Sequence, residues 1–66
     1  MNVKINDREH DIETGATVGS VMAERNIQPK GVAVALNGHL VTADKWAETV
    51  LSEGDSLVVM KAFYGG

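Results

Sequence analysis

VAVALNGHLV, residues 32–41, carries the clearest structural signal in this sequence. Large and small apolar side chains alternate over residues 32–36, and a period of two is typical of a β-strand. Asn37-Gly38 follows, and this dipeptide is the strongest short-range signal for a tight type I′ turn. An apolar pair, Leu40-Val41, then resumes the extended pattern. The stretch therefore predicts two strands joined by a tight turn.

The residues at the start of the chain predict a second pair of strands. Residues 2–6 alternate, with apolar side chains on one side, and residues 9–13 alternate again. Asn6–Glu9 between them is rich in turn-forming residues. In residues 9–13 one side carries only acidic side chains, which suits a solvent-exposed edge strand because the charges discourage pairing with another chain. We expect a β-hairpin here.

A helix is predicted between these two strand pairs. Thr17 is a good N-cap for a helix over Val18–Asn26. Val18, Val21 and Met22 fall at i, i+3 and i+4, so they form one apolar stripe that faces a core. Asn26 is suited to end the helix, and Pro29 prevents its continuation.

The last part of the chain predicts a short helical turn and a final strand. Thr42 is placed to cap a helical turn that ends at Trp46, whose ring we expect on the core. Glu53–Asp55 reads as a turn, and Ser56–Ala62 as the last strand. That strand is apolar on both sides, which favours a central position in the sheet.

The order of these elements predicts an α+β protein with a β-grasp (ubiquitin-like) fold. In that fold one main helix packs across a mixed sheet, and the helical crossover lets the first and last strands run parallel. We expect residues 1–62 to form the β-grasp domain and residues 63–66 to form a flexible C-terminal Gly-Gly tail.

Composition excludes several classes of function. The 66 residues contain no cysteine, so a disulfide or a thiolate metal site is impossible, and this suits a reducing cytoplasm. The net charge is −3 and the basic residues are scattered, so nucleic acid is not expected as a partner. No apolar run is long enough for a signal peptide or a membrane span, and we expect a cytoplasmic protein.

Candidate catalytic and metal-binding residues are few. His10 and His39 have no second ligand at metal-binding spacing, so no metal site is expected. The serines lack the glycine-flanked elbow of a hydrolase, and the dispersed glycines form no phosphate loop. We therefore expect that the chain is not an enzyme and binds no cofactor of its own.

The last strand predicts a partner-binding surface. If Leu57 and Val59 face the core, the side chains between them face away, and small side chains of the neighbouring strand join them. A contiguous apolar strip on a sheet face is typical of a protein interface, and methionine adapts well to partners. The predicted surface consists of Ala33, Ala35, Val58, Met60 and Ala62.

The C-terminal residues Phe63-Tyr64-Gly65-Gly66 carry the most specific functional signal. Glycine has no Cβ, so Gly65-Gly66 can thread a narrow channel in another protein. A carboxylate is a poor electrophile until it is activated, for example as an acyl-adenylate. We therefore expect Gly66 to be the modified residue, with Gly65, Tyr64 and Phe63 entering or anchoring in a partner groove.

The whole chain resembles the ThiS family, the sulfur carriers of thiamin thiazole biosynthesis. The resemblance rests on Ala35–Gly38 (Ala-Leu-Asn-Gly), Val41, Trp46, Glu53–Asp55 and the terminal Gly65-Gly66. It implies that a ThiF-like enzyme uses ATP and magnesium to adenylate the Gly66 carboxylate. It further implies that a persulfide donor converts this group to a thiocarboxylate, and that thiazole synthase (ThiG) takes the sulfur.

Two other functions are compatible with the same residues. A MoaD-like carrier for molybdopterin synthesis, or another ubiquitin-related carrier, would share the fold and the tail. A structural or regulatory β-grasp module would carry the Gly-Gly end incidentally, and it would tolerate residues added after Gly66. In each case we expect a monomer when the chain is free.

Overall fold

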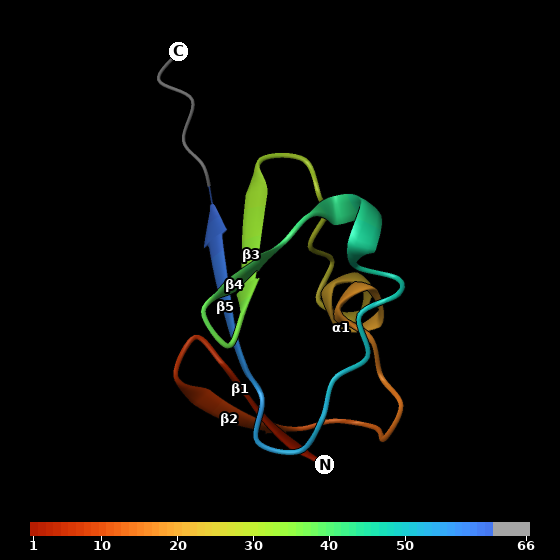
Figure 1. Cartoon of the computed structure of the whole chain (residues 1–66), viewed down its shortest axis with the longest axis vertical. Coiled ribbons are helices and arrows are strands. Elements are labelled where there is room, and N and C mark those ends of the chain that lie inside the picture. Colours follow the sequence, from red (N-terminus) through yellow and green to blue (C-terminus); the bar gives the residue numbers. More distant parts are fainter. Residues whose placement is uncertain (62–66) are drawn as a thin grey trace.

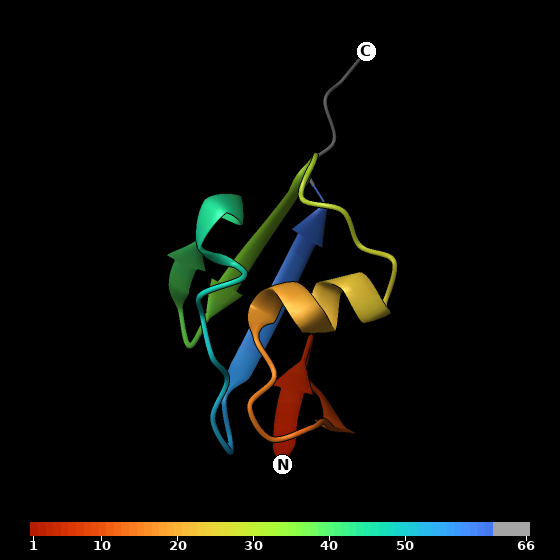
Figure 2. The ribbon, with the colours of Figure 1, turned by 90° about the vertical axis from the view of Figure 1, so that its right-hand side faces the viewer.

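A mixed sheet crossed on one face by a helix forms the body of the protein (Figures 1 and 2). The computed structural model describes residues 1–61, so the predicted tail and Ala62 lie outside the described residues. The elements, in chain order, are β1 (Asn2–Ile5), β2 (Arg8–Asp11), α1 (Val18–Glu24), β3 (Val32–Leu36), β4 (His39–Val41), the 3₁₀ turn η1 (Ala43–Lys45) and β5 (Ser56–Lys61).

The strand order is β2-β1-β5-β3-β4, which places β5 in the centre of the sheet. β5 runs parallel to β1, with Ile5 opposite Leu57, and antiparallel to β3. The parallel pair requires a crossover, and α1 lies in the connection across the sheet face (Figure 2). The β-grasp fold and the central position of the last strand are therefore confirmed.

Both hairpins turn through two residues with left-handed backbone. Asn37 and Gly38 have φ of 51° and 83°, as the predicted type I′ turn requires. Asn6 and Asp7 have φ of 51° and 66°, and β2 begins directly after them. The prediction of a four-residue turn over Asn6–Glu9 was wrong, because Asn and Asp tolerate this conformation and close the hairpin in two residues.

Helix α1 begins as predicted and ends two residues early. The Thr17 hydroxyl accepts a hydrogen bond from the Ser20 N–H (3.1 Å), and the Ser20 hydroxyl accepts one from the Thr17 N–H (2.9 Å). This reciprocal capping box satisfies donors that a helix N-terminus leaves unpaired. The helix ends at Glu24 because Asn26, with φ of 58°, takes the left-handed conformation that terminates a helix.

The second predicted cap is corrected by the structure. Thr42 occupies the N-cap position of η1, but its side chain makes no capping hydrogen bond. The turn is held instead by backbone hydrogen bonds, such as that from the Lys45 N–H to the Thr42 carbonyl (2.8 Å). Trp46 is buried as predicted, and its indole N–H donates to the Val41 carbonyl (3.1 Å).

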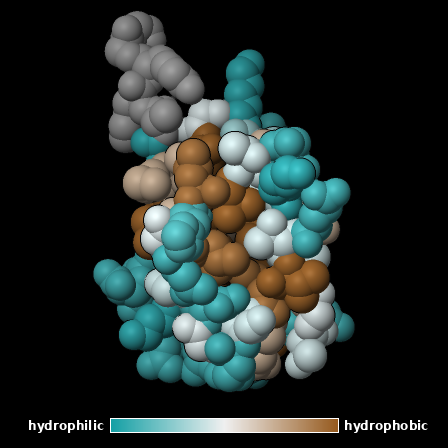
Figure 3. Space-filling view, viewed as in Figure 1, coloured by the Kyte–Doolittle hydropathy of each residue, from teal (hydrophilic) through white to brown (hydrophobic). Residues whose placement is uncertain are grey.

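The core lies between α1 and the inner face of the sheet. Apolar surface of the molecule remains visible between β3 and α1, and hydrophilic residues surround it (Figure 3). No helix within residues 1–61 is long and apolar enough to cross a bilayer. The buried core residues are Val3, Ile5, Val18, Val21, Met22, Val34, Trp46, Leu51 and Leu57.

Candidate functional site

The outer face of the sheet presents the predicted apolar strip. Ala33 lies opposite Met60 and Ala35 lies opposite Val58 in the β3–β5 ladder. Leu57, the residue before Val58 in β5, is fully buried, and side chains alternate between the two faces along a strand, so Val58 and Met60 face away from the core. Their side chains are 40% and 47% exposed. The structure places Ala33, Ala35, Val58 and Met60 on this face, and their role as a partner surface stays a prediction. Ala62 lies outside the described residues.

Leu40 extends this strip and was missed by the sequence reasoning. It is 67% exposed, the highest value among the large exposed hydrophobic residues. It lies opposite Ala35 in the β3–β4 ladder, so it shares the outer face. The predicted two-residue turn was enough to place Leu40 on this face. Such a turn pairs Leu36 with His39, and this register sets Ala35 opposite Leu40. We call Ala33, Ala35, Leu40, Val58 and Met60 the outer patch.

Two asparagine side chains hold the strand that leads to the tail. The Asn37 Oδ1 accepts from the Ser56 N–H (3.0 Å), and its Nδ2 donates to the Asp55 carboxylate (3.0 Å). At the other side of β5, the Asn6 Oδ1 accepts from the Val59 N–H (2.8 Å). Side chains from both hairpin turns therefore accept hydrogen bonds from the backbone of β5.

The histidines lie in different environments and do not approach one another as a ligand set. His10 is on β2, where its Nδ1 is 2.9 Å from an Arg25 guanidinium nitrogen. His39 is exposed at the β3–β4 turn. Within residues 1–61, no group of three His, Cys, Asp or Glu side chains is arranged to hold a metal ion.

The residues predicted to be modified or threaded lie outside the described part of the chain. They are Phe63, Tyr64, Gly65 and Gly66, and their roles stay predictions. The structure does describe Lys61, the last residue of β5, which lies five positions before Gly66. The outer patch lies on β3, β4 and β5, so it shares a strand with the residue from which the tail continues.

Comparison with known proteins identifies relatives over the full length of the chain. The ThiS family model matches residues 2–66. The sulfur carrier protein ThiS of Escherichia coli (strain K12) is 26% identical over 66 residues, which cover all of both chains. A thiazole synthase of Paramagnetospirillum magneticum is 30% identical over 66 residues, and this chain spans 20% of its length.

Solved structures show the same fold. The crystal structure of a ThiS protein from Geobacter metallireducens matches with a TM-score of 0.84 at 23% identity, over 100% of this chain and 99% of that one. A ubiquitin-like protein from the archaeon Caldiarchaeum subterraneum matches with a TM-score of 0.61 at 22% identity, over 98% and 100% of the two chains. These likenesses show the ubiquitin-like β-grasp fold.

Proposed function

Because the chain belongs to the ThiS family, we propose that it is a sulfur carrier of thiamin thiazole biosynthesis and that its Gly66 carboxylate carries the sulfur. The observation that carries this proposal is the family match over residues 2–66, which includes the terminal Gly65-Gly66. In this role the protein is a cosubstrate on which other enzymes act, and it is not a catalyst.

The chemistry requires activation of the carboxylate by another protein. A ThiF-like partner would join the Gly66 carboxylate to the α-phosphate of ATP with loss of pyrophosphate, and magnesium would offset the charge of the phosphates. The terminal sulfur of a persulfide donor would then attack the acyl carbon and displace AMP. Reduction of the resulting acyl disulfide by a thiol would leave a thiocarboxylate on Gly66.

Thiazole synthase is the proposed acceptor of that sulfur. A relative named thiazole synthase contains a segment similar to this entire chain, which supports a working relationship between the two activities. The outer patch offers an apolar surface on the strand that precedes the tail, and surfaces of this kind serve as protein interfaces. We propose that it docks the carrier on its enzymes, and that the carrier works in the cytoplasm as a free monomer between these encounters.

Intact-mass spectrometry tests the proposal directly. The chain is incubated with a ThiF-like enzyme, ATP, magnesium, a persulfide donor and a thiol. We expect a species in which one oxygen is replaced by one sulfur, located by fragmentation at Gly66. A chain lacking Gly66, and a chain with one alanine added after Gly66, are the controls. Thiolation of either control at another position would contradict the assignment.

A growth experiment separates thiamin synthesis from other sulfur-carrier pathways. A strain that lacks the chromosomal gene is grown without thiamin, with and without added thiazole. We expect thiazole to restore growth, and we expect the plasmid-borne chain to replace thiazole. If the deletion instead caused a requirement relieved by molybdopterin, the chain would serve that pathway.

A further inference from the structure

A cleft at the end of the sheet gathers much of the positive charge of the protein. The cleft has a volume of about 490 Å³. It lies between the segment that follows α1, the start of β3 and the last residue of β5. Arg25, Lys30 and Lys61 line it, which is half of the six lysine and arginine residues of the chain. None of the acidic residues within residues 1–61 lines it, although the chain carries a net charge of −3.

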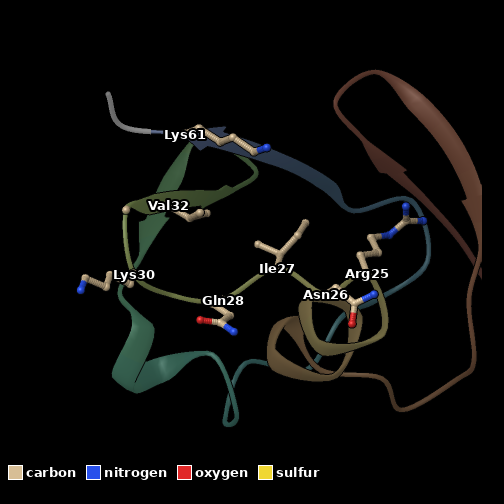
Figure 4. A pocket seen from close by; sticks show the side chains of 8 residues that line it. Arg25, Asn26, Ile27, Gln28, Lys30, Val32 and Lys61 are labelled. Carbon is tan, nitrogen blue, oxygen red and sulfur yellow. The ribbon is translucent and has the colours of Figure 1, made fainter. Parts of the chain in front are cut away.

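The floor of this basic cleft is apolar. Val32 lies opposite Lys61 in the β3–β5 ladder, so both occupy the helix-facing side of the sheet at its end. Ile27 and Val32 are half-buried and pack against the core, and both side chains point into the middle of the opening (Figure 4). The charged groups therefore surround an apolar surface that can accept a partner side chain.

A site for a small anion would require the cations to converge on one point, and these three cations do not. The Lys30 side chain points away from the middle of the cleft, whereas Lys61 extends across one side of it (Figure 4). Arg25 lies on the far side, with a guanidinium nitrogen 2.9 Å from the His10 Nδ1. This spacing fits several acidic groups distributed along a protein segment better than a single phosphate or carboxylate.

The position of Lys61 indicates which protein supplies that segment. Five residues span at most about 17 Å, so any enzyme that acts on the Gly66 carboxylate must come close to the basic cleft. The adenylating enzyme also holds ATP, whose phosphates repel an acidic carrier. Positive charge near the root of the tail would orient the carrier as it approaches, because local charge steers association even when the net charge opposes it.

We propose that the basic cleft binds an acidic segment of the adenylating partner beside its nucleotide site. This inference rests on the proposed function and adds a second contact surface to the outer patch. The contact would mainly raise the rate of association, so it would weaken as salt screens the charges. It would leave the chemical step unchanged once the carrier is bound.

Pyrophosphate release by the adenylating enzyme, with ATP, magnesium and varied carrier concentration, tests this proposal. The cleft variant is Arg25→Gln/Lys30→Gln/Lys61→Gln. The matched control is Lys4→Gln/Arg8→Gln/Lys45→Gln, which neutralises the other three basic residues and so changes the net charge equally. We expect the KM for the cleft variant to rise roughly tenfold with kcat unchanged, and the control to change less than about twofold.

The salt dependence and a second variant complete the test. Raising the ionic strength should raise the KM of the wild-type chain and bring it close to that of the cleft variant. Lys30→Gln/Lys61→Gln, which keeps the Arg25–His10 contact, should give an intermediate KM. Circular dichroism should show that all variants are folded, since the substituted cleft residues are exposed.

The failures of the two proposals are distinguishable. If the wild-type chain reacts and the cleft variant has an unchanged KM, the cleft proposal is overturned and the sulfur-carrier proposal stands. Equal increases of KM in the cleft and control variants would assign the effect to net charge and also overturn it. If the adenylating enzyme releases no pyrophosphate with the wild-type chain as its substrate, the proposed function fails and this inference fails with it.

Discussion

Leu40 lies directly opposite Ala35 in the β3–β4 ladder, and this pairing places a 67% exposed leucine on the face that carries Val58 and Met60. The small alanine between the larger side chains leaves a broad apolar surface across three strands. Leu40 contributes little to the core at this exposure, so its main effect is expected on partner binding.

Leu40→Glu should weaken binding to the partner enzymes without unfolding the chain. A charge placed in an apolar interface must lose its hydration, so we expect the KM for the carrier in pyrophosphate release to rise by about tenfold or more. The free energy of unfolding should change by less than about 0.5 kcal/mol. Val50→Glu is the control, because Val50 is 59% exposed and lies outside the outer patch, in an isolated bridge to Thr17.

Met22 and Met60 should differ in how much they contribute to stability. Met22 is fully buried, so Met22→Ala should cost about 2–5 kcal/mol. A domain of this size has little stability in reserve, so this variant should be largely unfolded at 37 °C. Met60→Ala, at a 47% exposed position, should cost less than about 1 kcal/mol. Urea denaturation followed by circular dichroism measures both, and equal costs would contradict the different burial of the two side chains.

Thr17 and Thr42 offer a test of side-chain capping. Thr17→Ala removes the hydroxyl that accepts from the Ser20 N–H, so it should lower the free energy of unfolding by about 1 kcal/mol. Thr42→Ala should lower it by less than about 0.5 kcal/mol, because the Thr42 hydroxyl makes no capping hydrogen bond. Chemical denaturation monitored by Trp46 fluorescence gives both values. A larger loss for Thr42→Ala would show that η1 is capped in solution.

Asn37 should stabilise β5 through its side chain as well as the turn through its backbone. Asn37→Gly keeps the left-handed backbone but removes two hydrogen bonds, one with the Ser56 N–H at the start of β5 and one with the Asp55 carboxylate just before it, so we expect a loss of about 1–2 kcal/mol. Asn26→Gly is the matched control, because Asn26 has a similar φ of 58° and makes no side-chain hydrogen bond within residues 1–61. The control should change the free energy of unfolding by less than about 0.5 kcal/mol.

Local patterns in the sequence sufficed to predict the elements and the β-grasp order. Asn37-Gly38 closed its hairpin as predicted, and Thr17 capped α1, because both signals depend only on neighbouring residues. The ends of the elements were less predictable. Asn26 was expected as the last helical residue, but its left-handed backbone lies beyond the end of α1 at Glu24. The left-handed backbone of Asn6 and Asp7 likewise closed the first hairpin in two residues, not four.

The apolar character of the outer patch was also readable from alternation along β3 and β5. Its extension to Leu40 depended on the register between β3 and β4, which follows from the length of the turn. The Asn6 and Asn37 side-chain bonds to β5 had no signal in the sequence. They join residues that lie far apart along the chain and become neighbours only when the sheet has formed.

The sequence alone determined the terminal Gly65-Gly66, the net negative charge and the alternation of the strands. Each of these depends only on composition or on residues that are adjacent in the chain. The basic cleft is different. In the sequence its cations look scattered, since Arg25 and Lys30 are separated from Lys61 by most of three strands. The pairing of β3 with β5 brings Val32 opposite Lys61, and only this long-range contact turns separate charges into one surface.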